Sequence, residues 1–274
     1  MDFNADAWAT VAAACGESGA TVDLADVAYV HPPGAVALVL AARARNQAAR
    51  SPLVVVPPTS GEVRTYLERV DVVAKLEALG TDVSGFDDVR HHGRHASAAF
   101  TEVLDEEGGL GAVLPVVWSF LVLQLGQATA RAAYSPLVAL VSNVDHHADP
   151  TGGPPPPAAA HVQVYSNRIE LAVGDLGAGF RASLAQNPAY VALPTDEAAL
   201  RAAVRDGATR HADPRHGGDV ARVVRRVRAL GGHVRLQSRS GGARATAPRV
   251  DYQTTPVAFP GTLVSLRLPR MMAP

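Results

Sequence analysis

The sequence predicts a mixed α/β protein in two parts. In residues 1–90, strand and helix patterns alternate twice, which favours a small α/β domain. A polar, aperiodic segment at residues 85–97 marks the boundary. Residues 96–274 combine helical patterns with alternating strands, which predicts a second α/β domain. The chain has 274 residues and is 47% hydrophobic, so it has enough apolar side chains for packed cores.

The N-terminal elements follow from apolar runs and the residues that flank them. Residues 21–30 predict a strand, and residues 34–45 predict a helix of small side chains. Residues 52–58 form a continuous apolar run between prolines, which is typical of a strand covered on both faces. Residues 61–79 carry a helical pattern with a break near Asp71.

The C-terminal part begins with three predicted helices, at residues 97–105, 111–128 and 135–147. Ser135 is a candidate cap of the third, with Pro136 in its first turn. Two alternating strands then flank a turn at residues 166–167. Two further helices are predicted: residues 194–207, between Thr195 as cap and Gly207, and the amphipathic residues 217–232. Strands at residues 233–239 and 262–269 close the domain.

Composition excludes several classes of protein. The net charge is −1, with 25 basic and 26 acidic residues, which gives no electrostatic signature for nucleic acid or anionic lipid. Cys15 is the only cysteine, so an intrachain disulfide is excluded and a reducing compartment is expected. The most apolar run, residues 112–125, is too short to span a bilayer. We therefore expect a soluble, cytoplasmic protein with neither a membrane nor a nucleic-acid partner.

The segment "LAVGDLGAGF", residues 171–180, carries the clearest functional pattern. A predicted strand ends at Asp175, and Gly177 and Gly179 follow. Glycine permits positive φ and lets a ligand approach the backbone. A carboxylate that only accepts hydrogen bonds suits the amino group of a flat heterocycle. The alternative interpretation is a β-turn with a solvated aspartate.

Taken together, "NVDHHA", D-x-G-x-G, a helix that begins at "GGD", and "FPGTLVSLRLP" occur in an order that resembles the GHKL, or Bergerat-fold, ATP-binding family. The resemblance covers residues 100–269 and implies an α/β sandwich that binds ATP or ADP with Mg²⁺. The resemblance implies that Asn143 is an Mg²⁺ ligand and that Asp175 accepts a hydrogen bond from the adenine amino group. It implies that Gly177 and Gly179 shape the adenine pocket, that Gly218 lies near the phosphates and that Thr262 closes the pocket.

The chain departs from that family at its catalytic positions. The family usually has a glutamate four residues before the asparagine, where this chain has Ala139, which cannot act as a general base. Val220 stands where the last glycine of the phosphate segment is usual, and Asp219 beside it would repel phosphates. We therefore predict no catalytic residue, and weak or absent ATP hydrolysis or Ser/Thr phosphotransfer.

The first part is similar to a STAS domain, the fold of anti-sigma-factor antagonists, with a generic α/β domain as the alternative. STAS regulators carry a phosphorylatable Ser or Thr before the second helix, and "VHPPGA" contains none. The two resemblances together imply a regulatory protein with a protein partner; a homodimer is an alternative. They leave two other functions open, a non-enzymatic interaction scaffold and a metal-dependent enzyme that uses His146 and His147. Neighbouring residues of a helix point about 100° apart, which disfavours one ion shared by both histidines.

Overall fold

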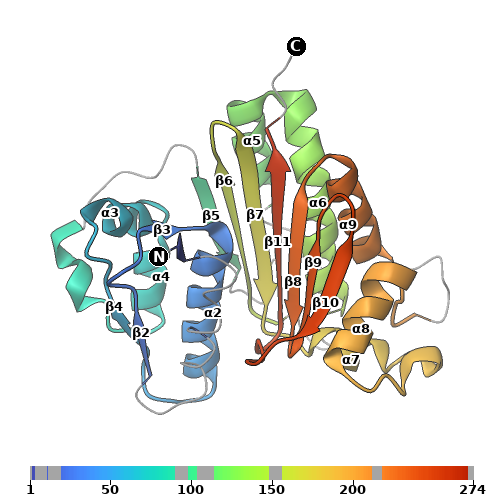
Figure 1. Cartoon of the computed structure of the whole chain (residues 1–274). Coiled ribbons are helices and arrows are strands. Elements are labelled where there is room, and N and C mark those ends of the chain that lie inside the picture. The colour runs from blue at the N-terminus through green and yellow to red at the C-terminus, as the bar shows by residue number, and fades with distance from the viewer. Residues whose placement is uncertain are drawn as a thin grey trace.

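A seven-stranded antiparallel sheet forms the middle of the protein (Figure 1). The computed structural model describes residues 2–3, 11, 20–89, 98–103, 114–147, 156–211 and 218–270. The strands are β5 (Ala98–Val103), β6 (Ala158–Val164), β7 (Arg168–Asp175), β8 (His233–Ser238), β9 (Gly241–Ala245), β10 (Val250–Thr254) and β11 (Thr262–Pro269). Their order across the sheet is β10-β9-β8-β11-β7-β6-β5. The last strand of the chain therefore lies in the centre, between β8 and β7.

Three helices cover one face of the sheet: α5 (Leu114–Leu125), α6 (Gln127–His147) and α9 (Asp219–Ala229) (Figure 1). Helix α6 contacts α5, α9 and β7. The valines of α9 are buried against the sheet while its arginines at 222, 225 and 226 are exposed, as the amphipathic pattern predicts. Shorter helical segments lie at the end of the sheet, namely α7 (Gly179–Leu184), η3 (Pro188–Tyr190), α8 (Asp196–Arg201) and the π-helical η4 (Ala202–Asp206).

The N-terminal part lies on the other side of the sheet (Figure 1). Its elements are β1 (Asp2–Phe3), β2 (Thr21–Asp23), β3 (Tyr29–Val30), α2 (Pro32–Gln47), β4 (Val54–Val56), α3 (Gly61–Arg69), α4 (Val72–Ala78) and the 3-10 helix η1 (Ser84–Val89). Strands β2 and β4 pair in parallel, as do β1 and β3. Strand β4 confirms the strand predicted between the prolines.

Helix α2 joins the two parts into one packed body. It contacts β6, β7 and β11 on one side and α4 on another, so its small apolar side chains are buried almost all round. Gly174 of β7 allows this approach. A Cβ atom there would lie 2.7 Å from Cδ1 of Leu40 and 2.9 Å from Cγ1 of Val36. The hydrophobic core of the N-terminal part consequently includes Ala172 and Leu263 of the large sheet.

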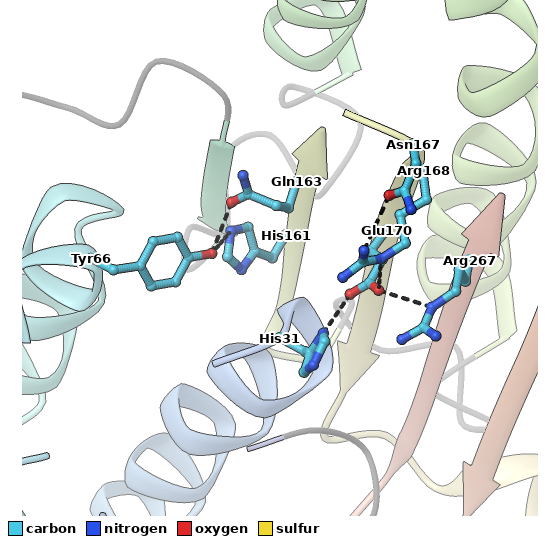
Figure 2. Close-up of polar contacts among 8 residues, drawn as sticks. All are labelled: His31, Tyr66, His161, Gln163, Asn167, Arg168, Glu170 and Arg267. Carbon is cyan, nitrogen blue, oxygen red and sulfur yellow. Dashed lines mark hydrogen bonds and ion pairs between the residues drawn. The ribbon is translucent and has the colours of Figure 1, made fainter. Parts of the chain in front are cut away.

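Polar side chains also cross this junction (Figure 2). The hydroxyl of Tyr66 in α3 donates to Oε1 of Gln163 at 3.0 Å and lies 3.4 Å from Nε2 of His161. Nδ1 of His31, at the start of α2, lies 2.8 Å from a carboxylate oxygen of Glu170 in β7. Burial raises the pKa of Tyr66, so its hydroxyl stays protonated and remains a donor. Such directional contacts determine how α2 and α3 are oriented on the sheet.

Local signals predicted most N-terminal elements, with one correction. The break near Asp71 is confirmed, since this residue has φ 63° between α3 and α4. The single strand predicted for residues 21–30 is wrong, because a turn separates β2 from β3. The amide of Ala25 donates to Oδ1 of Asp23 at 2.8 Å within that turn. Aspartate side chains commonly stabilise turns in this way, and here that contact competes with strand pairing.

The C-terminal part requires two corrections and one addition. The helix predicted for residues 97–105 is wrong, because residues 98–103 form β5 and pair with β6. The helix predicted to start at Ser135 begins at Gln127, with Pro136 inside it. Ala130 and Ala133 are fully buried, so the apolar face of α6 continues upstream of the proline. Strands β9 and β10 were not predicted.

The apolar helix predicted at residues 111–128 corresponds to α5. No helix in the described ranges combines the length and apolar character needed to cross a membrane.

Candidate functional site

A cavity lies at the end of the sheet where β7 stops and β11 starts. Asp175 and Thr262 are directly opposite each other in the pairing of these strands, so their side chains meet at this edge. Helix α6 contributes Asn143, and the start of α9 contributes Gly218. The cavity is lined by Asn143, Asp175, Gly179, Phe180, Ser183, Leu184, Ala203, Ala208, Thr209, Arg210, Gly218, Asp219, Val220 and Thr262. Five of the six residues predicted from the motifs thus converge on one site.

Asp175 is the buried carboxylate of this cavity, with only 3% of its surface exposed. Its Oδ1 accepts the backbone N–H of Gly177 at 2.8 Å. Burial raises the pKa of Asp175 to about 6, although N–H groups of Gly177 and Thr262 and the cation of Arg239 act in the opposite direction. At pH 7 the carboxylate is mostly ionised and can accept a hydrogen bond from a ligand amino group.

The two glycines after Asp175 have different tasks. Gly179 has φ +81°, and a Cβ atom on it would lie 2.9 Å from Oγ of Ser238 and 3.0 Å from Cγ of Arg239. Any other residue is therefore strained there, as predicted for a backbone that must turn tightly. Gly177 does not line the cavity; it binds the carboxylate of Asp175 through its N–H.

Two supporting residues at the end of β8 belong to none of the sequence motifs. Oγ of Ser238 accepts the N–H of Phe180 at 2.9 Å and lies 3.2 Å from Oγ1 of Thr262. Arg239 donates to the carbonyl oxygens of Ala178 and Gly177, both at 3.2 Å. These contacts tie the glycine turn to β8 and β11. The contacts from Ser238 and Arg239 to the glycine turn join residues about 60 positions apart, so no local pattern signals them.

The side expected to hold phosphates is built from two glycines in the left-handed region. Gly218 caps α9 with φ +74°, and Gly207 ends η4 with φ +71°. Asp219 occupies the first turn of α9, where a helix otherwise attracts anions, and forms an ion pair with Arg222. Asp219 therefore brings negative charge to the place where a phosphate would bind.

Arg210 also lines this side, in a segment that a neighbouring side chain holds in place. Nδ2 of Asn187 donates to the carbonyl oxygens of Thr209 and His211, both at 3.0 Å. Asn187 is 8% exposed, so these hydrogen bonds are shielded from water. The backbone that carries Arg210 is thus held in place, and the guanidinium of this residue is a cation beside the cavity.

The cavity is narrow in this conformation. Its volume is about 40 Å³, whereas sites for small molecules and cofactors commonly measure about 300–1,000 Å³. This is room for a few water molecules rather than for an adenine ring. The side chains of Phe180, Leu184 and Val220 line the cavity and restrict it. A nucleotide could enter only after some of these side chains move.

Ala139 lies four residues before Asn143 on α6 and packs against the apolar core. The two residues share a face of the helix, so the position of Ala139 is where a carboxylate could serve the cavity. The carboxylates that do line the cavity, among the described residues, are Asp175 and Asp219. Asp175 is held by backbone N–H groups and Asp219 by Arg222, so neither of these two described carboxylates is an evident general base.

The histidine-based metal hypothesis has no support in the described part of the chain. No group of three or more His, Cys, Asp or Glu side chains there could hold a metal ion. The side chains of His146 and His147, which this hypothesis uses, lie outside the described residues.

Comparisons with protein-family models, with curated proteins and with solved structures found no match to this chain.

Proposed function

We propose that this chain is a cytoplasmic regulatory protein with a degenerate GHKL-type domain that binds an adenine nucleotide and hydrolyses it weakly or not at all. The single observation that carries the proposal is the convergence of Asn143, Asp175, Gly179, Gly218 and Thr262 on one cavity. These residues span some 120 positions of sequence, and the motif order alone selected them.

The chemistry of the cavity supports adenine as the ligand. Asp175 is a buried acceptor at the end of a strand, beside a glycine turn that Ser238 and Arg239 stabilise. A buried acceptor discriminates strongly, because a ligand without a donor would leave it unpaired. Asn143 and the phosphate oxygens of the nucleotide would together provide the oxygen ligands that Mg²⁺ prefers.

The same cavity argues against efficient turnover. Ala139 cannot take a proton from water, and Asp219 opposes the negative charge of the phosphates. The adenine nucleotide would then act as a regulatory ligand that stabilises one conformation, rather than as a substrate that is hydrolysed.

Calorimetric titration of ATP and of ADP, each with and without Mg²⁺, tests the proposal. At a nucleotide concentration 100 times Kd, binding stabilises the folded state by about 2.7 kcal/mol, which raises Tm by several degrees. Asp175→Asn should abolish the effect, because the amide presents an N–H₂ group where an acceptor is needed. Asp251→Asn, on exposed β10, is the matched control and should bind like the wild type. No heat of binding and no shift in Tm at millimolar ATP would contradict the proposal that the chain binds a nucleotide.

A non-enzymatic interaction scaffold is the second candidate, favoured by two observations. The cavity of about 40 Å³ is too small for a nucleotide as it stands. In addition, α5 presents apolar side chains to solvent: Val116 is 61% exposed and Leu123 is 81% exposed. Exposed apolar side chains in one helix are typical of a surface that binds a protein or a second copy of the chain. Sedimentation of the wild type and of Leu123→Glu would distinguish this scaffold from the nucleotide-binding protein proposed above. A scaffold that dimerises through α5 becomes monomeric in the variant.

A further inference from the structure

A second cavity lies where the N-terminal part meets the large sheet. Its volume is about 430 Å³, within the usual range of about 300–1,000 Å³ for small-molecule sites. Strand β3 and the first half of α3 form one side, and the end of β6 with the turn that follows it forms the other. The described residues that line it differ from those that line the cavity around Asp175.

Three tyrosines give this second cavity aromatic walls. Tyr29 belongs to β3, Tyr66 to α3 and Tyr165 to the turn after β6. The rings of Tyr29 and Tyr165 have centroids 6.2 Å apart and planes tilted by 40°. An aromatic ring attracts a cation that lies over its face within about 6 Å of its centroid, so one small cation can be in reach of both rings.

The ring of Tyr66 is held between α3 and the sheet (Figure 2). Its hydroxyl donates to Oε1 of Gln163 at 3.0 Å, and its ring stacks on that of His161 with centroids 6.4 Å apart. Burial raises the pKa of Tyr66 and of Tyr165, so both hydroxyl groups stay neutral. The attraction of these two residues for a cation therefore comes from their rings and not from a phenolate.

One of these rings already contacts a cation of the chain itself. Cζ of Arg168 lies 4.0 Å from the ring centroid of Tyr165. Arg168 does not line the second cavity, so the cavity meets a different side of that ring. Nε of Arg168 is also 2.8 Å from the buried carboxylate of Glu170, which reduces the repulsion that a second cation beside Tyr165 would meet.

Glu62 contributes a carboxylate to the same cavity. It lies four residues before Tyr66 in α3, so the two side chains share one face of the helix. Its exposed position keeps it accessible to a charged ligand that enters from water. Ring faces beside a carboxylate suit an organic cation, because the rings contact its alkyl groups while the carboxylate opposes its charge.

We propose that this second cavity binds a small organic cation with an alkylated ammonium group, such as choline. A group of this kind is bulky and donates few or no N–H hydrogen bonds, so it exchanges water for ring contacts at low cost. The volume of the cavity fits a small molecule of this class. Because both parts of the chain form its walls, the bound cation would also stabilise their packing.

Isothermal titration of the full chain with choline tests the proposal. The reference ligand is its neutral carbon analogue, in which a tert-butyl group replaces the trimethylammonium group and the shape is unchanged. Choline should bind about tenfold more tightly, because only the cation is attracted by the rings and by Glu62. Glycine betaine should bind more weakly than choline, since Glu62 repels its carboxylate, and this difference should shrink in Glu62→Gln.

Variants of Tyr29 and Glu62 separate the two attractions. Tyr29 is 38% exposed, so its replacement disturbs little of the core. Tyr29→Leu should lose about fivefold in affinity for choline, whereas Tyr29→Phe keeps the ring and should bind like the wild type. Glu62→Gln should weaken binding, most clearly at low salt. Its matched control is Glu77→Gln, which removes the same charge from an exposed position of α4 and should have no effect.

A further variant guards against a change in folding. Ala28 lines the cavity and is exposed, so Ala28→Arg places a cation at the rings without altering a packed core. We expect this variant to melt at the wild-type temperature and to lose choline binding. Asp175→Asn should bind choline normally, so failure of nucleotide binding does not affect this test.

Three results would overturn the proposal. The first is no binding of choline at millimolar concentration in low salt. The second is equal affinity for choline and for its neutral analogue, which would indicate an apolar cavity without preference for a cation. The third is a preference of at least a hundredfold for a peptide that contains trimethyllysine over choline, which would assign the cavity to a protein partner.

Discussion

Gly261 is the residue at which a single methyl group should most directly disturb the Asp175 site. It immediately precedes Thr262 and lies against the end of β7. A Cβ atom at this position would overlap the carbonyl oxygen of Asp175, and would lie 2.7 Å from its carbonyl carbon and 2.8 Å from Cα of Leu176. All three are backbone atoms, so no side-chain rotation can relieve the overlap.

The cost of Gly261→Ala follows from these contacts. Nonbonded heavy atoms prefer about 3.5–4.0 Å, and the overlap with the carbonyl oxygen of Asp175 is the closest of the three contacts, so β11 and the end of β7 must separate by about 1 Å or more. Overpacking of this kind costs about 1–3 kcal/mol. The hydrogen bond from the N–H of Arg239 to the carbonyl of Gly261, 3.1 Å long, is strained by the same shift, at a further cost of about 1 kcal/mol. Alanine recovers about 0.4–1 kcal/mol by restricting the unfolded chain. We expect a net destabilisation of about 2–3 kcal/mol.

Urea unfolding followed by circular dichroism measures this change, with Gly61→Ala as the matched control. Gly61 begins α3, and the nearest atom to a Cβ there is a terminal nitrogen of Arg64 at 3.9 Å. The control should be unchanged or stabilised by up to about 1 kcal/mol. With a urea slope of about 1–3 kcal/mol/M, Gly261→Ala should unfold at roughly 1 M lower urea. Equal midpoints for the two variants would refute the close approach of β11 to Asp175.

Four further predictions concern single side chains. Burial alone would raise the pKa of Glu170, but hydrogen bonds, including that from His31, hold it at about 2. Because this is below the unfolded value of about 4.3, the stabilisation is complete above that pH and is lost as pH falls toward 2. Acid titration of stability should therefore show a loss of about 3 kcal/mol that Glu170→Gln lacks. Asp175 has the opposite sign: its folded pKa of about 6 lies above the unfolded value, so stability should fall as pH rises from about 4 to about 6. The urea midpoint should change less with pH in Asp175→Asn than in the wild type, and an equal change in both would contradict the raised pKa of Asp175. Thr195 accepts the N–H at the third position of α8 at 3.1 Å, so Thr195→Ala should cost about 1 kcal/mol while Thr195→Ser is neutral in the same assay. If the nucleotide binds, Ala139→Glu supplies the missing carboxylate and should raise phosphate release at least tenfold, since general bases contribute about 10²–10⁴; an unchanged rate would mean that other departures also prevent turnover.

Local chemistry explains which elements were predictable. Thr195 was predicted as a cap and is one, since its hydroxyl accepts a backbone N–H within four residues. The break at Asp71 also follows from nearby residues. Residues 98–103 form a strand because they pair with β6, some 60 residues later in the chain. A six-residue segment with few periodic signals takes its conformation from such partners rather than from its own propensity.

The hairpin of β9 and β10 was missed for a related reason. Gly241 and Gly242 lower the strand propensity of the segment, yet both are needed by the packing. A Cβ on Gly241 would lie 2.6 Å from backbone atoms of Asp196 at the start of α8, and a Cβ on Gly242 would lie 3.0 Å from Cγ2 of Thr255. Gly241 thus weakens the strand pattern but allows α8 to approach the sheet, and Gly242 makes room for the side chain of Thr255.

The order of motifs in the sequence determined which residues meet at the Asp175 cavity, because strand ends and helix starts bring them to one edge of the sheet. It also placed Ala139 where the GHKL family, which the order of motifs resembles, usually has a glutamate. Only the tertiary structure decided that Phe180, Leu184 and Val220 narrow the cavity to about 40 Å³. It alone brought Tyr29, Tyr66 and Tyr165 to one cavity. Both outcomes depend on strand register and on the packing of helices that are distant in sequence, and no local propensity encodes either.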